Sequence, residues 1–214
     1  MSLSEKLSKR ATKAGLALSS DVFARLAAYF ELLRKWNRKV SLTSLPVEEI
    51  GDEAVDRLLI EPVLAAKSLV SSDSTAIDIG SGGGSPAIPL KIAAPTLAMR
   101  MVESKSRKAA FLREAVRTLE LPQTVVEAVR FEELLVRPEL HESADVVTMR
   151  AVKIDVKVLG ALQSFLTANG RFFLFSTGRA AAHEVFGSQF AVGAKTPLLK
   201  QWGSYLEILQ KRST

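Results

Sequence analysis

A single glycine-rich stretch restricts the fold of this chain more than any other feature of its sequence. Residues 75–79 form an apolar run of strand length. Gly80, Gly82 and Gly84 follow, and Pro86 comes next, at a place where a helix can begin because its first turn needs no N–H from proline. The stretch therefore predicts a strand, a glycine turn and a helix, which together bind an adenosine-type ligand at the carboxyl end of a parallel strand.

The spacing of the glycines indicates which ligand is bound. A dinucleotide fingerprint needs its third glycine where Ser85 stands, and a Walker loop needs a Gly-Lys-Ser/Thr ending that this stretch lacks. Asp78 lies two residues before the first glycine. The resulting D-x-G-x-G-x-G pattern resembles motif I of the S-adenosylmethionine (AdoMet)-dependent methyltransferases. This implies that Gly80, Gly82 and Gly84 bracket the methionine portion of AdoMet. Asp78 either meets the cofactor's ammonium through water or caps the loop's N–H groups, and both roles stay open.

A carboxylate ends the next expected strand. Residues 97–102 have the composition of a strand, and Glu103 follows them, about twenty residues after the glycines. At this place in a doubly wound sheet a carboxylate accepts hydrogen bonds from ribose hydroxyls. The same charge would also favour the N-terminus of the following helix. The two roles are compatible, and we expect Glu103 to bind the ribose.

The composition excludes several classes of site. The 214-residue chain has no cysteine and two histidines that lie far apart in the sequence, so we expect neither a metal site nor a nucleophilic triad. No apolar run reaches the ~18 residues of a membrane span, and the N-terminus has no apolar signal core. A cytoplasmic protein without a membrane contact is therefore expected. The formal net charge of +6 favours a polyanionic partner such as nucleic acid.

The first seventy residues are expected to be helical and to form an N-terminal extension of the same compact unit. Apolar residues recur at helical spacing up to Gly15, and again up to Trp36. A third helical pattern begins near Pro46, and Pro62 is expected to break or kink it.

Residues 71–214 are expected to form the cofactor-binding domain, because strand and helix patterns alternate there. Strands are expected at 75–79, 97–102, 124–129, 144–148, 171–175, 189–192 and 205–209, and helices at 87–94, 105–119, 131–135, 154–166 and 178–186. This order predicts an α/β fold with a mostly parallel seven-stranded sheet flanked by helices and closed by an antiparallel edge. It fits the Rossmann-like fold of the class I AdoMet-dependent methyltransferases.

Four blocks of sequence together resemble one family. Residues 78–90 resemble its D-I-G-S-G-x-G-x-P-G-I-P-L block, residues 33–43 its K-W-N-x-x-x-N-L-T block, and residues 102–112 and 147–151 its two later blocks. The family is RsmG, also called GidB, the bacterial 16S ribosomal RNA guanine-N7 methyltransferases. The resemblance implies an RNA-binding enzyme of rRNA processing that uses AdoMet to form 7-methylguanosine. Its partner would be 16S rRNA or the small ribosomal subunit, and a monomer is expected.

The resemblance also implies roles for single residues. Ser85 lies beside the cofactor, and Phe131 with Glu132 matches a pair that contacts the adenine, although Phe131 is also compatible with a place in the core. Arg150 matches an arginine at the cofactor and the target base, so it is the candidate catalytic residue and also a cofactor-binding residue. Its guanidinium suits a carboxylate or a phosphate.

Three positions depart from the family's pattern. Ser85 stands where the family usually has Phe or Leu, Arg57 where it has His, and Ser176 where it has Lys. None of these positions belongs to the glycine motif. They leave two other interpretations open: an AdoMet-dependent methyltransferase of another RNA or a small molecule, and a non-catalytic RNA-binding protein on the same fold.

The residues also restrict the acceptor atom. Methylation of cytosine C5 would need a cysteine nucleophile, and methylation of an exocyclic amine commonly uses an [N/D]-P-P-[Y/F] loop after the fourth strand. The chain has no cysteine, and residues 148–151 there read Thr-Met-Arg-Ala. Ring nitrogens and oxygens remain as acceptors. Guanine N7 carries a free lone pair and no proton, so its methylation needs no general base, and none stands out in the sequence.

Basic residues gather in three parts of the chain. The clusters are Lys6, Lys9, Arg10 and Lys13; Arg34, Lys35, Arg38 and Lys39; and Lys105, Arg107, Lys108, Arg113 and Arg117. Each cluster alone is typical of a solvated helix face. On a basic chain, the three together favour electrostatic binding of RNA. Trp36 is interpreted as a core residue rather than a base-stacking one, because it recurs at helical spacing with Leu33.

Overall fold

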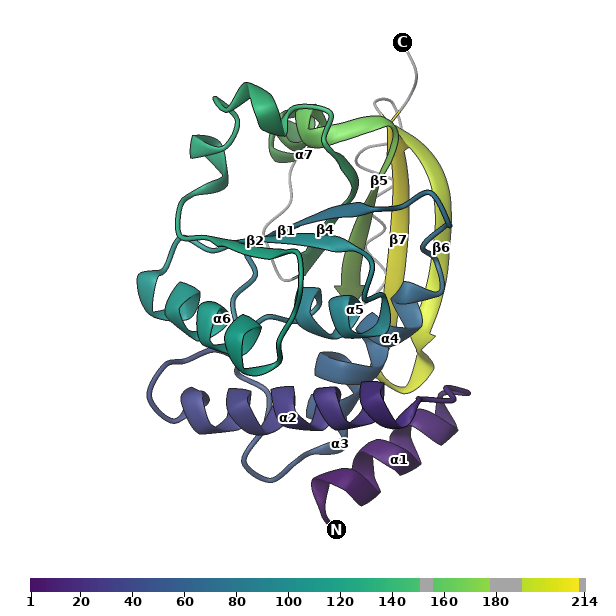
Figure 1. Cartoon of the computed structure of the whole chain (residues 1–214). Coiled ribbons are helices and arrows are strands. Elements are labelled where there is room, and N and C mark those ends of the chain that lie inside the picture. The colour runs from purple at the N-terminus through teal and green to yellow at the C-terminus, as the bar shows by residue number, and fades with distance from the viewer. Residues whose placement is uncertain (151–155, 178–189, 212–214) are drawn as a thin grey trace.

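The computed structural model describes residues 1–150, 156–177 and 190–211, and a seven-stranded sheet forms its centre (Figure 1). The strands are β1 (Thr75–Ile79), β2 (Ala98–Val102), β3 (Thr124–Glu127), β4 (Ala144–Arg150), β5 (Leu166–Thr177), β6 (Phe190–Leu199) and β7 (Ser204–Lys211). Their order is β3-β2-β1-β4-β5-β7-β6. Pairs from β3 to β5 are parallel, and β7 pairs antiparallel with β5 and β6. The expected mostly parallel sheet with an antiparallel edge is confirmed.

Helices cover both faces of this sheet. In Figure 1, α4, α5 and α6 lie along one face, α7 lies on the other, and α1 and α2 form a further layer outside α5 and α6. The helices are α1 (Leu3–Lys13), α2 (Ser20–Asn37), α3 (Asp52–Val55), α4 (Glu61–Ala66), α5 (Ala87–Ala93), α6 (Ser106–Thr118) and α7 (Val156–Leu162). Shorter turns are η1 (Asp56–Ile60), η2 (Phe131–Glu133), η3 (Pro138–Leu140), η4 (Gln163–Phe165) and η5 (Lys200–Trp202).

The apolar run of β1 is explained by burial on both faces. Ala76 belongs to an apolar cluster that contains Ile88 of α5 and Leu112 of α6. Its neighbour Ile77 belongs to the cluster on the other face, which contains Leu159 of α7. Successive side chains of a strand point to opposite faces, so a strand covered by helices on both sides needs apolar residues at nearly every position.

The N-terminal helices share the core of the sheet. Leu7 of α1 and Phe30 of α2 are buried in the same apolar cluster as Ile88. Tyr29 of α2 is also fully buried, and its hydroxyl donates a 2.6 Å hydrogen bond to the backbone oxygen of Gly83 in the glycine turn. Helix α2 of the N-terminal segment therefore contacts the glycine turn directly.

The segment around Pro62 differs from the prediction. α3 begins at Asp52 rather than near Pro46, and the chain continues through the π-helical turn η1 into α4 without a break. In η1 the N–H of Glu61 donates to the backbone oxygen of Asp56, five residues earlier. Pro62 lies in the first turn of α4, where the wider register of the preceding turn accommodates the missing N–H. The prediction of a break at Pro62 is therefore wrong, and the hydrogen-bond register of the helix changes directly before it.

The boundaries after β4 also differ. The helix expected at 154–166 ends at Leu162, and β5 begins at Leu166 rather than at residue 171. Gly170 therefore lies inside a strand, where a Cβ would come within 2.8 Å of the Cβ of Leu166. β6 runs to Leu199, well beyond the expected end at residue 192, and η2 is shorter than the helix expected at 131–135. The helix expected at 178–186 lies outside the described residues.

Only part of the expected basic surface remains available. Arg10 is buried and bonds to Asp56 and Asp52, and Lys6 lies 3.0 Å from Asp52. Three other pairs are Arg34 with Glu31, Arg38 with Glu48 and Arg117 with Glu114. Within the described part of the chain, Lys35, Lys39, Lys105, Arg107, Lys108 and Arg113 form no salt bridge.

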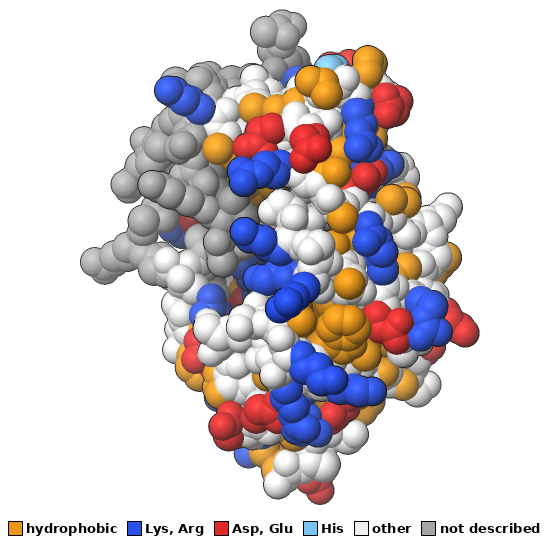
Figure 2. Space-filling view, turned by 90° about the vertical axis from the view of Figure 1, so that its left-hand side faces the viewer, with side chains coloured by type: hydrophobic (Ala, Val, Ile, Leu, Met, Phe, Trp, Pro, Cys, Tyr) orange, Lys and Arg blue, Asp and Glu red, His pale blue; other side chains and the backbone are white. Residues whose placement is uncertain are grey.

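Among the described residues, Lys9 and Lys13 of α1 form no salt bridge either, whereas the six other cations without a salt bridge lie at or just after the end of α2 and in α6 or directly before it. Figure 2 looks onto this side of the molecule and shows Lys and Arg side chains gathered along the middle of the face. Trp36 lies between the two helices, partly buried, with its ring edge-on to that of Phe111 at 5.8 Å. The interpretation of Trp36 as a packing residue agrees with this contact.

Candidate active site

Two adjoining cavities lie at the carboxyl edge of the sheet. The larger, of about 340 Å³, is lined by residues 42–45, the glycine turn from Gly80 to Gly83, and the side chains of Arg57, Ser85, Glu103, Lys108 and Arg150. The smaller, of about 200 Å³, is lined by Phe131, Glu132 and their neighbours. Gly80 and Glu103 line both cavities. The two cavities therefore adjoin at the start of the glycine turn and together form one elongated site.

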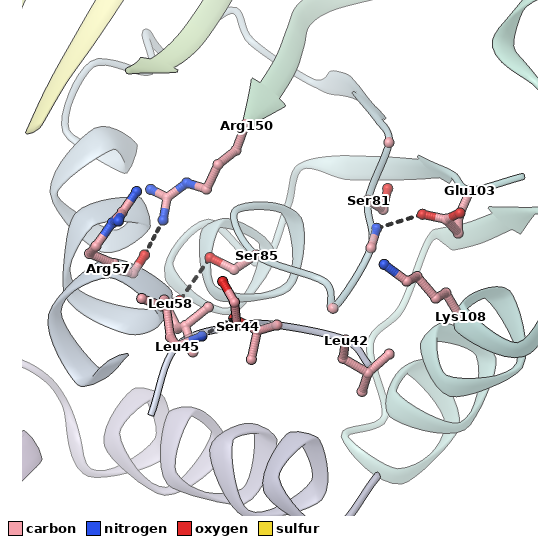
Figure 3. Close-up of a pocket in the computed structure, with 14 residues that line it drawn as sticks. Leu42, Ser44, Leu45, Arg57, Leu58, Ser81, Ser85, Glu103, Lys108 and Arg150 are labelled. Carbon is pink, nitrogen blue, oxygen red and sulfur yellow. Dashed lines mark hydrogen bonds between the residues drawn. The ribbon is translucent and has the colours of Figure 1, made fainter. Parts of the chain in front are cut away.

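The order of the strands arranges the predicted residues along this site. Phe131 follows β3, Glu103 follows β2, Gly80 follows β1, and Arg150 ends β4. Because these four strands are neighbours in the sheet in that order, their carboxyl ends place the residues in the same order along one edge. Figure 3 shows the larger cavity, with Glu103 at one end and Arg150 at the other.

The glycine turn has a backbone that needs glycine at three places. Gly80, Gly82 and Gly84 have φ values of 72°, 53° and 87°, which side-chain-bearing residues rarely adopt. The N–H groups of Gly80 and Ser81 both donate to the backbone oxygen of Val102, at 2.9 and 3.0 Å. The turn is thereby held against the end of β2.

Gly84 has a different surrounding from the other two glycines. A Cβ at Gly84 would come within 2.5 Å of Ile88 Cδ1 and 3.3 Å of Leu112 Cδ2, whereas a Cβ at Gly82 would meet nothing closer than 3.7 Å. Gly84 thus allows the turn to pack on α5 and α6, and it is not among the residues that line either cavity. Its predicted contact with the cofactor stays a prediction.

Glu103 links the glycine turn to the next helix. Its Oε2 accepts a 2.9 Å hydrogen bond from the N–H of Gly82, and its Oε1 accepts a 2.7 Å bond from the N–H of Lys105, the residue that caps α6. The Glu103 carboxylate therefore lies at the N-terminus of α6, one of the two positions expected from the sequence. It also lines both cavities, where the other interpretation places the ribose.

Asp78 lies beneath the turn and is not among the residues that line the cavities. Its side chain is 1% exposed, and its Oδ1 accepts a hydrogen bond from Thr148 Oγ1. Its Oδ2 has no hydrogen-bond partner among the described residues. Burial raises the pKa of Asp78 to about 6, although the Thr148 hydroxyl opposes this rise. The side-chain hydrogen bond of Asp78 thus runs to β4, and the turn bonds to its backbone oxygen through Ser81 Oγ at 3.1 Å. The N–H of Gly82 is accepted by Glu103 instead.

Arg150 is held by residues of the N-terminal helical segment. Its Nη2 donates to Glu61 Oε2 at 2.8 Å, its Nη1 donates to the backbone oxygen of Arg57, and its guanidinium lies 4.5 Å from the centre of the Phe175 ring. Burial lowers the pKa of Arg150, and the charge of Glu61 counteracts this. The guanidinium is thus fixed in one orientation at the cavity wall.

Pro62 explains why backbone oxygens are available at this wall. A proline cannot donate to the backbone oxygen of Leu58, four residues earlier, or to that of Arg57, five residues earlier. Site residues bind both oxygens instead: Ser85 Oγ donates to Leu58 O at 3.0 Å, and Arg150 Nη1 donates to Arg57 O. The widened turn before Pro62 therefore connects the N-terminal segment to the two predicted site residues.

The site contains residues that sequence reasoning missed. Residues 42–45 line the larger cavity. Asn37 Oδ1 positions this segment by accepting the N–H groups of Leu42 and Thr43 at 2.9 and 3.0 Å. Lys108 and Glu61 were likewise not predicted as site residues. The available signals were the block at 33–43 and the proline inside a helical pattern, but neither reveals which part of the sheet it contacts.

Phe131 and Glu132 line the smaller cavity from η2, as the adenine contact requires. Glu132 is exposed, whereas Phe131 is half-buried and also packs against the apolar cluster of that face. Phe131 therefore lines the cavity and also packs in the core, and its contact with the adenine stays a prediction.

The residues of the elongated site fit AdoMet. The larger cavity has a backbone wall of glycines without side chains, and the boundary of the two cavities carries the Glu103 carboxylate. The far wall carries buried Nε atoms of Arg57 and Arg150 without a hydrogen-bond partner. Among residues 1–150, 156–177 and 190–211, no group of three His, Cys, Asp or Glu residues is placed to hold a metal ion. In the same ranges, no helix is both long and apolar enough to span a membrane.

Solved structures share the fold. A SAM-dependent methyltransferase from Aquifex aeolicus aligns with a TM-score of 0.57 over 77% of this chain and 96% of its own, at 14% sequence identity. A precorrin-6y C5,15-methyltransferase from Geobacter metallireducens aligns with a TM-score of 0.52 over 70% of this chain and 85% of its own, at 18% identity. The expected Rossmann-like methyltransferase fold is confirmed.

Sequence comparisons confirm the resemblance noted above. A protein named ribosomal RNA small subunit methyltransferase G from Roseiflexus castenholzii is 37% identical over 188 residues, which cover 88% of this chain and 79% of the relative. One of the same name from a Geobacter species is 35% identical, covering 88% of this chain and 83% of its own. The model of the GidB family, described as rRNA small subunit methyltransferase G, matches residues 23–196. The chain therefore belongs to the GidB family.

Proposed function

We propose that this protein transfers the methyl group of AdoMet to N7 of a guanine in 16S rRNA of the small ribosomal subunit. The observation that supports this most strongly is the elongated site, in which the ends of four adjacent parallel strands carry the residues expected for each part of AdoMet. Membership of the GidB family supports the RNA substrate and the reaction.

Each part of the site has a separate task in this proposal. Phe131 and Glu132 contact the adenine, Glu103 accepts the ribose hydroxyls, and the turn at Gly80 and Gly82 lies along the methionine portion. When bound, AdoMet supplies an electrophilic methyl group. Binding both reactants in one orientation is then the main contribution of the protein.

The ionisable residues of the larger cavity suit an acceptor without a proton. They are Glu103, whose two oxygens are both hydrogen-bonded, and the three cations Arg57, Lys108 and Arg150. Guanine N7 has a lone pair and no proton, so its attack requires no base at this position. Arg150, fixed by Glu61 and Arg57 O, is the residue proposed to contact both AdoMet and the target base.

The basic face supports RNA as the partner. Lys35, Lys39, Lys105, Arg107 and Arg113 belong to α2, α6 and the residues next to them and form no salt bridge within the described residues, and Lys108 of α6 lines the larger cavity. Cations without a salt bridge bind phosphates electrostatically. We further propose that the protein acts in the cytoplasm as a monomer, and that its helical extension and its AdoMet domain form a single unit.

Methyl transfer from labelled AdoMet tests the proposal. Small subunits from a strain that lacks this enzyme are expected to take up label, whereas large subunits and free nucleosides are not. Parallel reactions with small subunits and with the naked RNA identify which of the two is the substrate. Labelling of free small molecules with none in RNA would contradict the RNA substrate, and binding of RNA without binding of AdoMet would contradict the enzyme.

A further inference from the structure

Two arginines share one wall of the larger cavity. Arg57 and Arg150 both line it, and Figure 3 shows their side chains close together at the end away from Glu103. Arg57 Nη1 donates to Glu53 Oε1 at 3.2 Å. The Nε atoms of both arginines are buried and have no hydrogen-bond partner among the described residues. Buried N–H groups without an acceptor are costly.

The wall carries two guanidinium groups and one buried carboxylate. That carboxylate is Glu61, whose Oε2 is paired with Arg150 and whose Oε1 has no hydrogen-bond partner among the described residues. Glu53, the partner of Arg57, has a side chain that is 36% exposed, so water screens it. The charge of Arg57 therefore acts on Arg150 and lowers its pKa in addition to the effect of burial. An oxyanion placed at this wall would offset the repulsion between the two guanidinium groups that line it.

The order of the site indicates which oxyanion it is. From β3 to β1 the edge carries the residues proposed for the adenine, the ribose and the start of the methionine portion, and Arg150 ends the next strand, β4. The single carboxylate of AdoMet lies at the end of the molecule opposite the adenine. In this orientation the carboxylate would face the wall of Arg57 and Arg150, whereas Lys108 lies at the end of the cavity near Glu103.

We propose that Arg57, together with Arg150, binds the α-carboxylate of AdoMet, so that Arg57 is a residue that determines cofactor specificity. The inference rests on the proposed function, because it takes AdoMet as the ligand. A guanidinium presents several donors in a planar fork that suits a carboxylate. The backbone oxygen of Arg57 orients Arg150 while its side chain supplies the second cation.

Calorimetric titration with AdoMet and with decarboxylated AdoMet tests this proposal. The two ligands differ in the carboxylate, and the wild-type protein is expected to prefer AdoMet. Arg57→Gln removes the cation but keeps the backbone oxygen that Arg150 uses. We expect it to lose about tenfold or more in affinity for AdoMet, the usual size of a charge-assisted hydrogen bond, and to keep its affinity for decarboxylated AdoMet. Arg57→Lys should retain part of the preference.

Lys108→Gln is the matched control, because it removes a cation from the other end of the same cavity. Its ratio of AdoMet to decarboxylated AdoMet affinity should equal that of the wild type. The proposal is overturned if Arg57→Gln weakens both ligands equally, or if Lys108→Gln is the variant that removes the preference.

Two further outcomes are distinguishable. Weaker binding of a small-subunit RNA fragment by Arg57→Gln, with the ligand preference unchanged, would mean that Arg57 binds an RNA phosphate and would overturn the proposal. Absence of AdoMet binding by the wild-type protein would instead overturn the proposed cofactor, and this inference with it. Circular dichroism of each variant establishes that it is folded before the titrations are compared.

Discussion

At the scale of single residues, the site depends on buried charges that constrain one another. Arg150 meets Glu61 and the backbone oxygen of Arg57, and Asp78 meets Thr148. Both carboxyl groups are nearly inaccessible to solvent, and burial raises the pKa of each of them. Glu61 therefore positions Arg150 and Asp78 binds Thr148, but ionising these buried carboxyl groups lowers the stability of the folded protein.

The pH dependence of the free energy of unfolding should reveal the raised pKa of Asp78. The carboxyl has a pKa of about 6 in the folded protein and its ordinary value of 3.8 when unfolded. Between these values the folded state binds more protons, so its stability falls as pH rises from 4 to 6 and stays level above. In Asp78→Asn this loss is absent. The free energy of unfolding of the variant minus that of the wild type should rise by about 3 kcal/mol across this range.

Urea titrations of both proteins at several pH values measure this difference. Thr148 can still donate to an Asn side-chain oxygen, which makes the variant a close match. A difference that is constant from pH 4 to 7 would show that Asp78 titrates normally.

Arg150 is predicted to affect stability and activity separately. Arg150→Ala leaves Glu61 buried without its cation, which should cost about 3 kcal/mol or more of stability. Adding Glu61→Gln removes the uncompensated charge and should restore much of that stability, whereas methyl transfer should stay at least a hundredfold below wild type in both variants. Recovery of activity together with stability in the double variant would show that Arg150 has only a structural role.

At the scale of elements, the π-helical turn η1 is the feature that brings the N-terminal segment to the sheet edge. It lies directly before Pro62, and the backbone oxygens of Arg57 and Leu58 are bound by Arg150 and Ser85. The π-turn and the proline together convert two backbone groups of a helix into acceptors for a site. Short π-helical insertions frequently occur at functional sites.

Pro62→Ala tests this interpretation. The new N–H can donate to Leu58 O or Arg57 O and so compete with Ser85 and Arg150. We expect AdoMet affinity to fall about three- to tenfold, which corresponds to the loss of roughly one hydrogen bond, while the thermal midpoint does not fall. Pro138→Ala in η3 serves as the control and should leave affinity unchanged. A lowered midpoint with normal affinity would mean that Pro62 acts on folding alone.

The elements that could be predicted from the sequence are those determined by local pattern. β1 was predicted with its observed bounds because an apolar run ends in a glycine turn, and β2 and β4 followed from the same alternation of strand and helix. The start of β5 was missed because residues 166–170 read Leu-Thr-Ala-Asn-Gly, which looks like the end of a helix and a turn rather than a strand. The pairing of Leu166 with Ala144 is a long-range contact that no local pattern shows. The path of residues 42–45 into the cavity also depends on tertiary contacts, which no local pattern encodes.

At the scale of the whole molecule, one buried carboxylate joins three parts of the chain. Asp56 in η1 accepts hydrogen bonds from Arg10 Nε of α1 at 2.7 Å, and from Gln201 Nε2 and Trp202 Nε1 of η5 at 3.1 and 2.7 Å. It therefore ties the first helix and the turn between the last two strands to the segment that carries Arg57. We propose on this basis that residues 1–70 and 71–214 unfold together.

Arg10→Gln should reveal this coupling. Removing the cation leaves the Asp56 carboxylate buried without an opposite charge, which should lower the free energy of unfolding by about 3 kcal/mol. Circular dichroism and tryptophan fluorescence should report one coincident urea transition, shifted to lower urea in the variant. Lys9→Gln, an exposed change on the same helix, should shift it by less than about 0.5 kcal/mol. Two separate transitions would show that the helical extension unfolds independently.

If the elongated site methylates N7 of a guanine in small-subunit rRNA, chemical mapping will locate the methyl group on that atom. Small subunits that lack the modification are incubated with the protein and AdoMet, and their RNA is reduced and treated with aniline, which cleaves at 7-methylguanosine. One new cleavage in 16S rRNA is expected, and it should be absent with Arg150→Ala. Methyl incorporation into this RNA without any aniline cleavage would contradict the proposed reaction, because the accepting atom would then not be N7.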